Sequence, residues 1–172
     1  NGPRGVGKTS TARIFARIIN QDSLKEGDDL SFNIFELDAA SNNSVEDIRY
    51  ITDQVRIPPQ VGKYKVYIID EVHMLSNAAF NAFLKTLEEP PPHAIFILAT
   101  TEKHKIIPTI LSRCQVYNFS RIKVADMVAH LENIANKEGI TYEKEALFVI
   151  AEKADGALRD SLSIFDQIVN FS

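Results

Sequence analysis

The first 120 residues alternate between two hydrophobic patterns. Apolar residues that recur every three to four positions predict amphipathic helices, whereas short continuous apolar runs predict strands buried on both faces. Alternating helices and strands are typical of an α/β fold, in which helices flank both faces of a parallel sheet. The predicted strands cover residues 32–37, 65–69, 94–99 and 116–119.

Start and stop signals frame the predicted helices. The first helix covers residues 8–20. Ser44 and Asp47 have the spacing of a capping box at the start of the second helix, and Ser76 is a suitable cap for the third. Prolines end the second and third helices, and Pro108 favours the start of a short fourth one.

From Ala125 onward the pattern becomes helical only, which predicts a small three-helix unit after the sheet. Gly139 favours the end of its first helix. We therefore expect an α/β domain in residues 1–120, without its N-terminal strand, and a small three-helix domain in residues 121–172. The three predicted helices cover residues 125–139, 143–154 and 157–170.

Composition and charge narrow the possible classes of protein. The chain has 172 residues, 45% of them hydrophobic, which suffices for one buried core and a small appended domain. No apolar run approaches the roughly 20 residues that a membrane-spanning helix needs. The net charge is −4, with 13 basic and 14 acidic residues through Ser120 and 6 and 9 after it. This balance excludes a basic, stand-alone nucleic-acid module, so DNA contacts would come from a local patch or an assembled oligomer.

Two further features concern the context of the chain. The single cysteine, Cys114, excludes an internal disulfide and suits a reducing compartment, so we expect a cytoplasmic protein. The chain also begins directly at a glycine-rich loop. The strand that should lead into Gly2 is absent, so we expect a truncated N-terminus.

The stretch over residues 2–9, GPRGVGKT, fits the phosphate-loop pattern G-x-x-x-x-G-K-[ST]. Its glycines let successive amides face one concave spot that suits an anion. Lys8 adds a positive charge, the Thr9 hydroxyl is placed to bind magnesium, and the following helix points its N-terminus at the phosphates. The alternative is a glycine-rich turn with a chance Lys-Thr pair. We expect nucleotide contacts from Gly2, Arg4, Gly5, Val6, Gly7, Lys8, Thr9 and Ser10.

Asp70 and Glu71 follow the apolar run 65–69 and supply what a phosphate loop lacks for hydrolysis. Asp70 would reach the magnesium shell, often through water. Glu71 is the natural general base for a water that attacks the γ-phosphate. The alternative is a solvated pair at a strand end.

Three more residues are candidates with weaker support. Thr101 ends the next apolar strand and would lie at the same sheet edge, where it could touch the attacking water or the γ-phosphate. An ordinary strand-terminal threonine is an equal alternative. Arg113 can stabilise transition-state charge if another subunit supplies it, and a surface ion pair is the alternative. Arg159 can close the helical unit over bound nucleotide, and a helix-surface charge is its alternative.

Several long motifs carry a family resemblance that covers essentially the whole chain. The chain resembles the ATPase subunit, gamma/tau, of bacterial DNA polymerase III clamp loaders, in the AAA+ superfamily. The resemblance implies an AAA+ P-loop sheet domain followed by a three-helix lid. The matching runs are DAAS at 38–41, DEVHMLS at 70–76, FNAFLKTLEEPP at 80–91 and ILSRC at 110–114.

The resemblance also implies a function and the roles of the candidates. It implies an ATP-hydrolysing motor subunit that loads a sliding clamp onto primed DNA, with other clamp-loader subunits, the clamp and DNA as partners. The implied roles are ATP and Mg²⁺ binding for Lys8 and Thr9, metal binding for Asp70, catalysis for Glu71, sensor 1 for Thr101, an arginine finger acting in trans for Arg113, and sensor 2 for Arg159.

One segment departs from the family pattern. The family usually carries a four-cysteine zinc module between its first helix and second strand. Here the corresponding residues 21–31, which include Gly27, are polar, predict a loop and contain no cysteine. Either the module is lost or a segment is missing, and we expect no zinc in this chain.

Two other functions remain as alternatives. A non-hydrolysing structural subunit of the same assembly would keep Ser-Arg-Cys but lose the phosphate loop, and intact Lys8 and Glu71 oppose it. Another AAA+ DNA-remodelling ATPase, such as a Holliday-junction motor, would share the nucleotide machinery but would not be expected to combine LEEPP with SRC.

Overall fold

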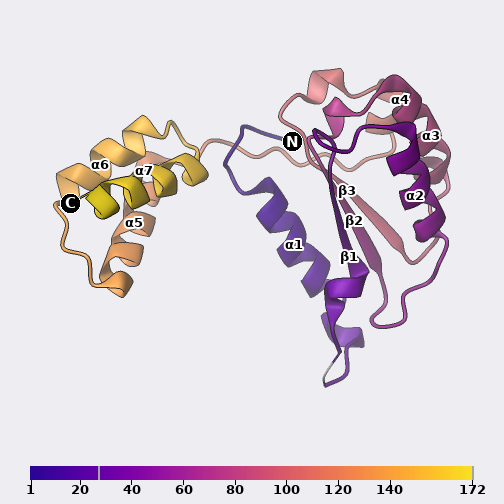
Figure 1. The fold of residues 1–172 in the computed structure, drawn as a ribbon, viewed down its shortest axis with the longest axis horizontal. Helices are drawn as coiled ribbons and strands as arrows, with labels where there is room; N and C mark the ends of the chain where they lie inside the picture. The colour runs from indigo at the N-terminus through magenta and orange to yellow at the C-terminus, as the bar shows by residue number, and fades with distance from the viewer. Residues whose placement is uncertain (27, 172) are drawn as a thin grey trace. The chain divides into compact units, whose positions relative to one another are not determined.

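A computed structural model describes residues 1–26 and 28–171 of the protein. The chain forms two compact units, drawn together in Figure 1. The first contains Asn1 and residues 8–117, and the second contains residues 2–7 and the chain from Asn118 onward. The proposed domain boundary between residues 120 and 121 stays a prediction.

The first unit is built on a three-stranded parallel sheet. Its strands are β1 (Ile34–Asp38), β2 (Lys65–Asp70) and β3 (Ala94–Leu98), in the order β1-β2-β3. In the register of the sheet, Asp38 lies opposite Asp70 and Ile69 lies opposite Leu98. All three strands therefore end at one edge, and the predicted parallel α/β sheet is confirmed.

Helices cover both faces of this sheet (Figure 1). The helix α1 (Lys8–Ile18) packs on one face, while α2 (Val45–Val55) and α3 (Asn77–Glu88) pack on the other. Because successive side chains along a strand point to opposite faces, β2 contributes side chains to the cores on both faces of the sheet. Its residues Val66 and Ile68 belong to the core with α1, and Tyr67 and Ile69 to the core with α2 and α3.

The predicted helix signals are confirmed in the structure. The Ser44 hydroxyl accepts a hydrogen bond from the Asp47 amide, and the Asp47 carboxylate accepts one from the Ser44 amide. Ser76 caps α3 by accepting a hydrogen bond from the Ala79 amide. Pro108 is the first residue of the short helix α4 (Pro108–Leu111).

Two predicted strands need correction. The first begins at Ile34 rather than at residue 32, because Phe32 and Asn33 belong to the turn η2 (Leu30–Asn33). The predicted strand over residues 116–119 is wrong, since this segment joins no sheet among the described residues. A strand is held by ladder hydrogen bonds to a neighbour, and none of the described strands pairs with residues 116–119.

The predicted loop over residues 21–31 contains the short turn η1 (Gln21–Ser23) and the beginning of η2. Gly27, which also belongs to this prediction, lies outside the described residues.

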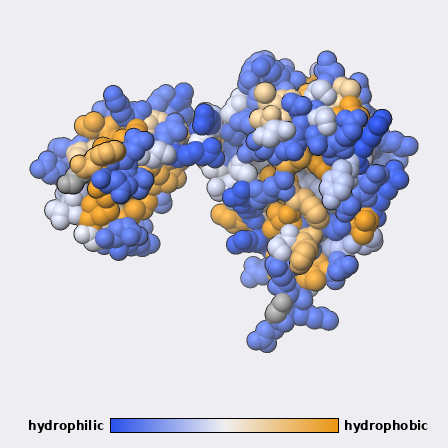
Figure 2. Space-filling model, viewed as in Figure 1, coloured by the Kyte–Doolittle hydropathy of each residue, from blue (hydrophilic) through white to orange (hydrophobic). Residues whose placement is uncertain are grey.

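The second unit is helical, with α5 (Val124–Glu138), α6 (Lys144–Lys153) and α7 (Leu158–Phe171). Gly139 ends α5 with a φ of +69°, as the sequence predicts. Hydrophilic residues cover much of the visible surface of each unit, with hydrophobic side chains exposed between them (Figure 2). Across the described residues, no helix has the length and hydropathy needed to cross a membrane. The core of the second unit includes Met127, Leu131, Leu147, Ile150 and Phe165.

Candidate nucleotide-binding site

The carboxyl ends of β2 and β3 and the start of α1 bring several predicted site residues together. Thr9 lies in the first turn of α1, and Asp70 is the last residue of β2. The Thr9 hydroxyl donates a hydrogen bond of 2.6 Å to Oδ2 of Asp70, although the two residues are far apart in sequence. The structure thus places the Thr9 hydroxyl directly against the carboxylate that ends the central strand.

Thr9 and Asp70 have the chemistry that a magnesium ion requires. Magnesium prefers oxygen ligands, and it usually combines one or two protein side chains with waters and substrate phosphates. A hydroxyl and a carboxylate oxygen facing each other satisfy this demand. Among the described residues, no group of three or more histidine, cysteine or carboxylate side chains could hold a metal ion. Those residues therefore form no site in which protein side chains alone surround a metal.

Glu71 occupies an unusual backbone conformation at the end of β2. Its φ of +46° and ψ of +43° lie in the left-handed region, which costs a non-glycine residue energy. Its amide donates a hydrogen bond of 2.9 Å to Oδ1 of Asp70. Its carboxylate oxygen Oε2 accepts hydrogen bonds from the Thr101 amide and hydroxyl, at 3.2 and 3.0 Å. Glu71 is therefore fixed at both its backbone and its side chain.

Three residues beside Glu71 were missed by the sequence analysis. His73, in the turn η3 (Val72–Met74), has Nδ1 at 2.9 Å from Oγ1 of Thr100 and Nε2 at 3.2 Å from Oε1 of Glu102. The Thr100 hydroxyl also accepts a hydrogen bond from the Glu102 amide. The only available signal was the histidine within DEVHMLS, because its partners follow a different strand.

Glu102 is linked in turn to the basic turn η4 (Lys103–Lys105). Lys105 lies 2.9 Å from the Glu102 carboxylate, and His104 lies 3.6 Å from it. The hydrogen bond from Lys105 lowers the pKa of Glu102, so this carboxylate stays ionised at neutral pH.

Residues 2–7 of the glycine-rich loop belong to the second unit, where the loop contacts Arg159. Gly5 has a φ of +73°, which glycine adopts without strain. The Arg159 amide donates a hydrogen bond of 3.4 Å to the Gly5 carbonyl, and a Cβ at Gly5 would lie 3.0 Å from Cβ of Ala157. The backbone at the start of α7 is thus held against the loop. The roles predicted for Arg4, Val6 and Ser10 stay predictions.

Arg113 lies just after α4, in the first unit. Its guanidinium is 3.1 Å from Oε1 of Glu88 at the end of α3, and it donates a hydrogen bond of 2.6 Å to the Thr109 carbonyl. Both side chains of the ion pair are exposed. The ion pair offered as the alternative is thus present, and a role of Arg113 in trans stays a prediction.

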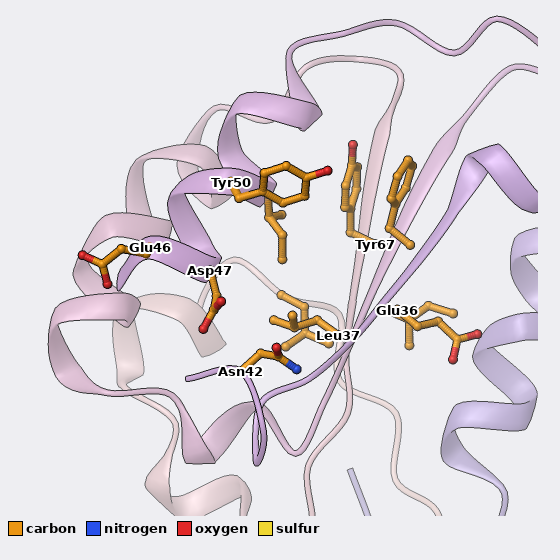
Figure 3. A pocket seen from close by; sticks show the side chains of 11 residues that line it. Glu36, Leu37, Asn42, Glu46, Asp47, Tyr50 and Tyr67 are labelled. Carbon is orange, nitrogen blue, oxygen red and sulfur yellow. The ribbon is translucent and has the colours of Figure 1, made fainter. Parts of the chain in front are cut away.

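A pocket of about 400 Å³ lies elsewhere, between the edge strand β1, β2 and α2 (Figure 3). Its lining includes Phe35, Leu37, Tyr50 and Tyr67, and it contains none of the predicted site residues. The rings of Phe35 and Tyr67 stack, with centroids 4.9 Å apart. Burial raises the pKa of Tyr67 to about 12, so its phenol stays protonated at physiological pH.

Known proteins match both parts of the chain. A family model described as "DNA polymerase III, delta subunit" matches residues 1–123, and one described as "DNA polymerase III clamp loader subunit, ATPase lid domain" matches residues 126–172. The DNA polymerase III subunit tau of Bacillus subtilis (strain 168) is 49% identical over 185 aligned positions, which cover 100% of this chain and 33% of that protein. The chain therefore spans about a third of the length of this relative.

Solved structures share the fold. The Holliday junction branch migration motor RuvB of Thermotoga maritima has a TM-score of 0.73 and 20% identity, covering 96% of this chain and 51% of that chain, which shows the fold alone. A DNA polymerase III gamma subunit-related protein of Thermotoga maritima has a TM-score of 0.56 and 27% identity, covering 91% of this chain and 54% of that chain. With both family matches and a relative of 49% identity, the chain belongs to the DNA polymerase III gamma/tau family of AAA+ clamp-loader subunits.

Proposed function

We propose that this chain is the nucleotide-binding part of an ATP-hydrolysing motor subunit of the bacterial replicative clamp loader. The motor would load the sliding clamp onto primed DNA within a ring of clamp-loader subunits. The observation that carries the proposal is the chain of contacts from Thr9 through Asp70 and Glu71 to Thr101. It joins the Thr9 hydroxyl, at the start of α1, to a fixed carboxylate at one edge of the sheet.

Each residue has a distinct task in this mechanism. The amides of residues 2–7 and the Lys8 ammonium bind the phosphates. Thr9 and Asp70 would hold magnesium, which neutralises phosphate charge when it is bound. Glu71 accepts a proton from the attacking water, and Thr101 orients Glu71 through two hydrogen bonds.

Two arginines complete the proposed mechanism. Arg113 would leave its ion pair with Glu88 and stabilise the transition state on a neighbouring subunit. Arg159, at the start of α7 in the unit that contains the loop, would report on the bound nucleotide. Both assignments rest on the matching motifs rather than on a contact with nucleotide.

The proposal is preferred over a non-hydrolysing subunit of the same assembly. Such a subunit needs neither a loop lysine nor a positioned catalytic carboxylate. This chain has Lys8, and its Glu71 is held by Thr101 in a strained backbone conformation. Strain of this kind persists when the surrounding structure enforces it, and it is common at active sites.

We also propose that this chain binds no zinc. A structural zinc site requires about four closely placed cysteine or histidine ligands. The chain has one cysteine, Cys114, and residues 21–31 contain neither cysteine nor histidine. Metal analysis of the purified full-length protein tests this, and one equivalent of tightly bound zinc within this region would contradict it.

The function is tested by measuring ATP hydrolysis of the full-length protein assembled with its partner subunits. The rate is measured with and without sliding clamp and primed DNA. We expect hydrolysis that rises when both are added. ATP binding without any hydrolysis would favour the structural-subunit alternative, and hydrolysis indifferent to clamp and primed DNA would favour another AAA+ remodelling ATPase.

A further inference from the structure

The imidazole of His73 connects two carboxylates that come from different strand ends. Its Nδ1 lies 3.3 Å from Oε2 of Glu71, and its Nε2 lies 3.2 Å from Oε1 of Glu102. The His73 side chain is only 6% exposed, compared with 29% for Glu71 and 36% for Glu102. A buried ring with a polar partner at each nitrogen has little freedom to turn, because rotation would leave a buried nitrogen unpaired.

Three contacts converge on one oxygen of Glu71. Oε2 accepts hydrogen bonds from the amide and the hydroxyl of Thr101, and it also faces Nδ1 of His73. Fixing Oε2 fixes the direction in which the other oxygen, Oε1, points. A general base must lie within hydrogen-bond reach of the proton that it removes, so the direction of the free oxygen matters for hydrolysis.

The far side of the His73 ring is anchored as well. Glu102 is held by Lys105 at 2.9 Å, and its amide donates a hydrogen bond to the Thr100 hydroxyl. Thr100 also contacts Nδ1 of His73 at 2.9 Å. The ring is therefore braced against the segment that follows β3, while it touches the carboxylate that follows β2.

We infer that His73 is a positioning residue for ATP hydrolysis, an inference that rests on the function proposed above. Its Nδ1 side holds Oε2 of Glu71 and so presents Oε1 to the attacking water. Its Nε2 side keeps the ring in place through Glu102. His73 touches neither ATP nor water in this scheme and acts through Glu71.

Two amide substitutions separate the two sides of the ring. The amide of asparagine branches at Cγ and takes the place of Nδ1, so His73→Asn retains a donor toward Glu71 and Thr100. The amide of glutamine lies one atom farther out and takes the place of Nε2, so His73→Gln retains the contact with Glu102. His73→Ala removes both contacts. His130→Ala, on the exposed surface of α5, is the matched control.

The experiment measures kcat and KM for ATP in the full-length protein assembled with its partner subunits, clamp and primed DNA. Binding of a fluorescent ATP analogue and the thermal unfolding midpoint are measured for each variant. We expect His73→Ala and His73→Gln to lower kcat about 10- to 100-fold, the order of effect that misplacement of a catalytic group produces. We expect KM and analogue affinity to stay unchanged, and His73→Asn to restore most of kcat.

The outcomes separate this inference from the proposed function. Wild-type protein that binds but does not hydrolyse ATP would overturn both. Active wild-type protein with normal kcat in a folded His73→Ala variant would overturn the role of His73 alone. If kcat instead follows the unfolding midpoint across the three variants, or if His73→Gln restores activity and His73→Asn does not, His73 has only a structural role and the inference is also overturned. An inactive His130→Ala control would likewise overturn it, because loss of kcat would not be specific to His73.

Discussion

The carboxylates and the arginines of the candidate site are held in different ways. Asp70 and Glu71 lie at the end of a buried central strand, and their oxygens accept hydrogen bonds from Thr9, Thr101 and a backbone amide. Arg113 instead forms an exposed ion pair with Glu88, a kind of contact that contributes little to stability.

This difference indicates which half of the chemistry is prepared in advance. Preorganised groups need no rearrangement during the reaction and so stabilise charge efficiently. Asp70 and Glu71 meet this condition, and the residues that hold them all belong to the first unit. In the proposed mechanism, Arg113 would exchange its present partner, Glu88, for a phosphate bound by a neighbouring subunit.

The largest effect is expected from Lys8→Ala, which removes the fixed cation of the phosphate loop. The variant should lose measurable ATP binding while its fold survives, because Lys8 is only partly buried and belongs to none of the hydrophobic cores. Titration of a fluorescent ATP analogue into the full-length protein measures the affinity, and circular dichroism checks the fold. Wild-type affinity in a folded variant would remove Lys8 from the site.

Arg113→Ala tests whether Arg113 acts on the nucleotide of a neighbouring subunit. We expect ATP binding by the same subunit to persist and hydrolysis in the adjacent subunit to fall, by roughly 10³- to 10⁵-fold if Arg113 is an arginine finger. The measurement is clamp- and DNA-stimulated hydrolysis in the assembled complex.

Mixing two inactive subunits separates action in trans from action in cis. Subunits with Lys8→Ala keep the finger, and subunits with Arg113→Ala keep the pocket. Mixed assemblies should regain hydrolysis that neither variant shows alone. If co-assembled subunits regain none, Arg113 works within its own subunit or is structural.

Glu71→Gln tests the carboxylate half directly. The amide keeps the shape of the side chain but cannot take a proton, so hydrolysis should fall by roughly 10²- to 10⁴-fold while ATP and magnesium binding persist. Single-turnover hydrolysis and analogue binding are measured on the same samples. Asp70→Asn is the informative companion, because it should instead weaken the dependence on magnesium. Normal turnover in Glu71→Gln would exclude Glu71 as the base.

The smallest effect is expected from an ion pair that involves none of the carboxylates or arginines of the candidate site. Arg13 on α1 forms two hydrogen bonds of 2.6 Å to Glu36 on β1, with both side chains partly exposed. A double-mutant cycle with Arg13→Ala and Glu36→Ala should give a coupling of about 0.2–1 kcal/mol that declines with added salt. A coupling energy of several kcal/mol that does not change with salt would show that exposed ion pairs in this protein are strong. The ion pair between Arg113 and Glu88 could then no longer be treated as weak.

Local signals were sufficient to predict most helices and strands. Ser44, Ser76 and Pro108 mark helix starts through contacts within a few residues, so the sequence displays them directly. Residues 116–119 were predicted as a strand because their composition favours one, but a strand also needs a neighbour. Pairing is a tertiary property, and composition does not reveal whether the partner is present.

The candidate site was predictable where a residue belongs to a motif or, like Thr101, follows a predicted strand. Thr9, Asp70 and Glu71 were identified from spacing and from their position after an apolar run. His73 was missed because its contacts with Thr100 and Glu102 depend on two strands lying side by side. The left-handed backbone of Glu71 was equally hidden, since glutamate has no particular preference for that conformation.

The order of the strands has a consequence for how the protein folds. β2 pairs with β1 and with β3, and each partner lies roughly 30 residues away, across a connection that contains a helix, as parallel pairing requires. Neither pair can form as a local hairpin. Each long connection must lose conformational entropy before the strand hydrogen bonds stabilise the pair, and this slows folding. Glu71 follows β2 and Thr101 follows β3, so the hydrogen bonds between these two residues depend on the pairing of two strands that are distant in sequence.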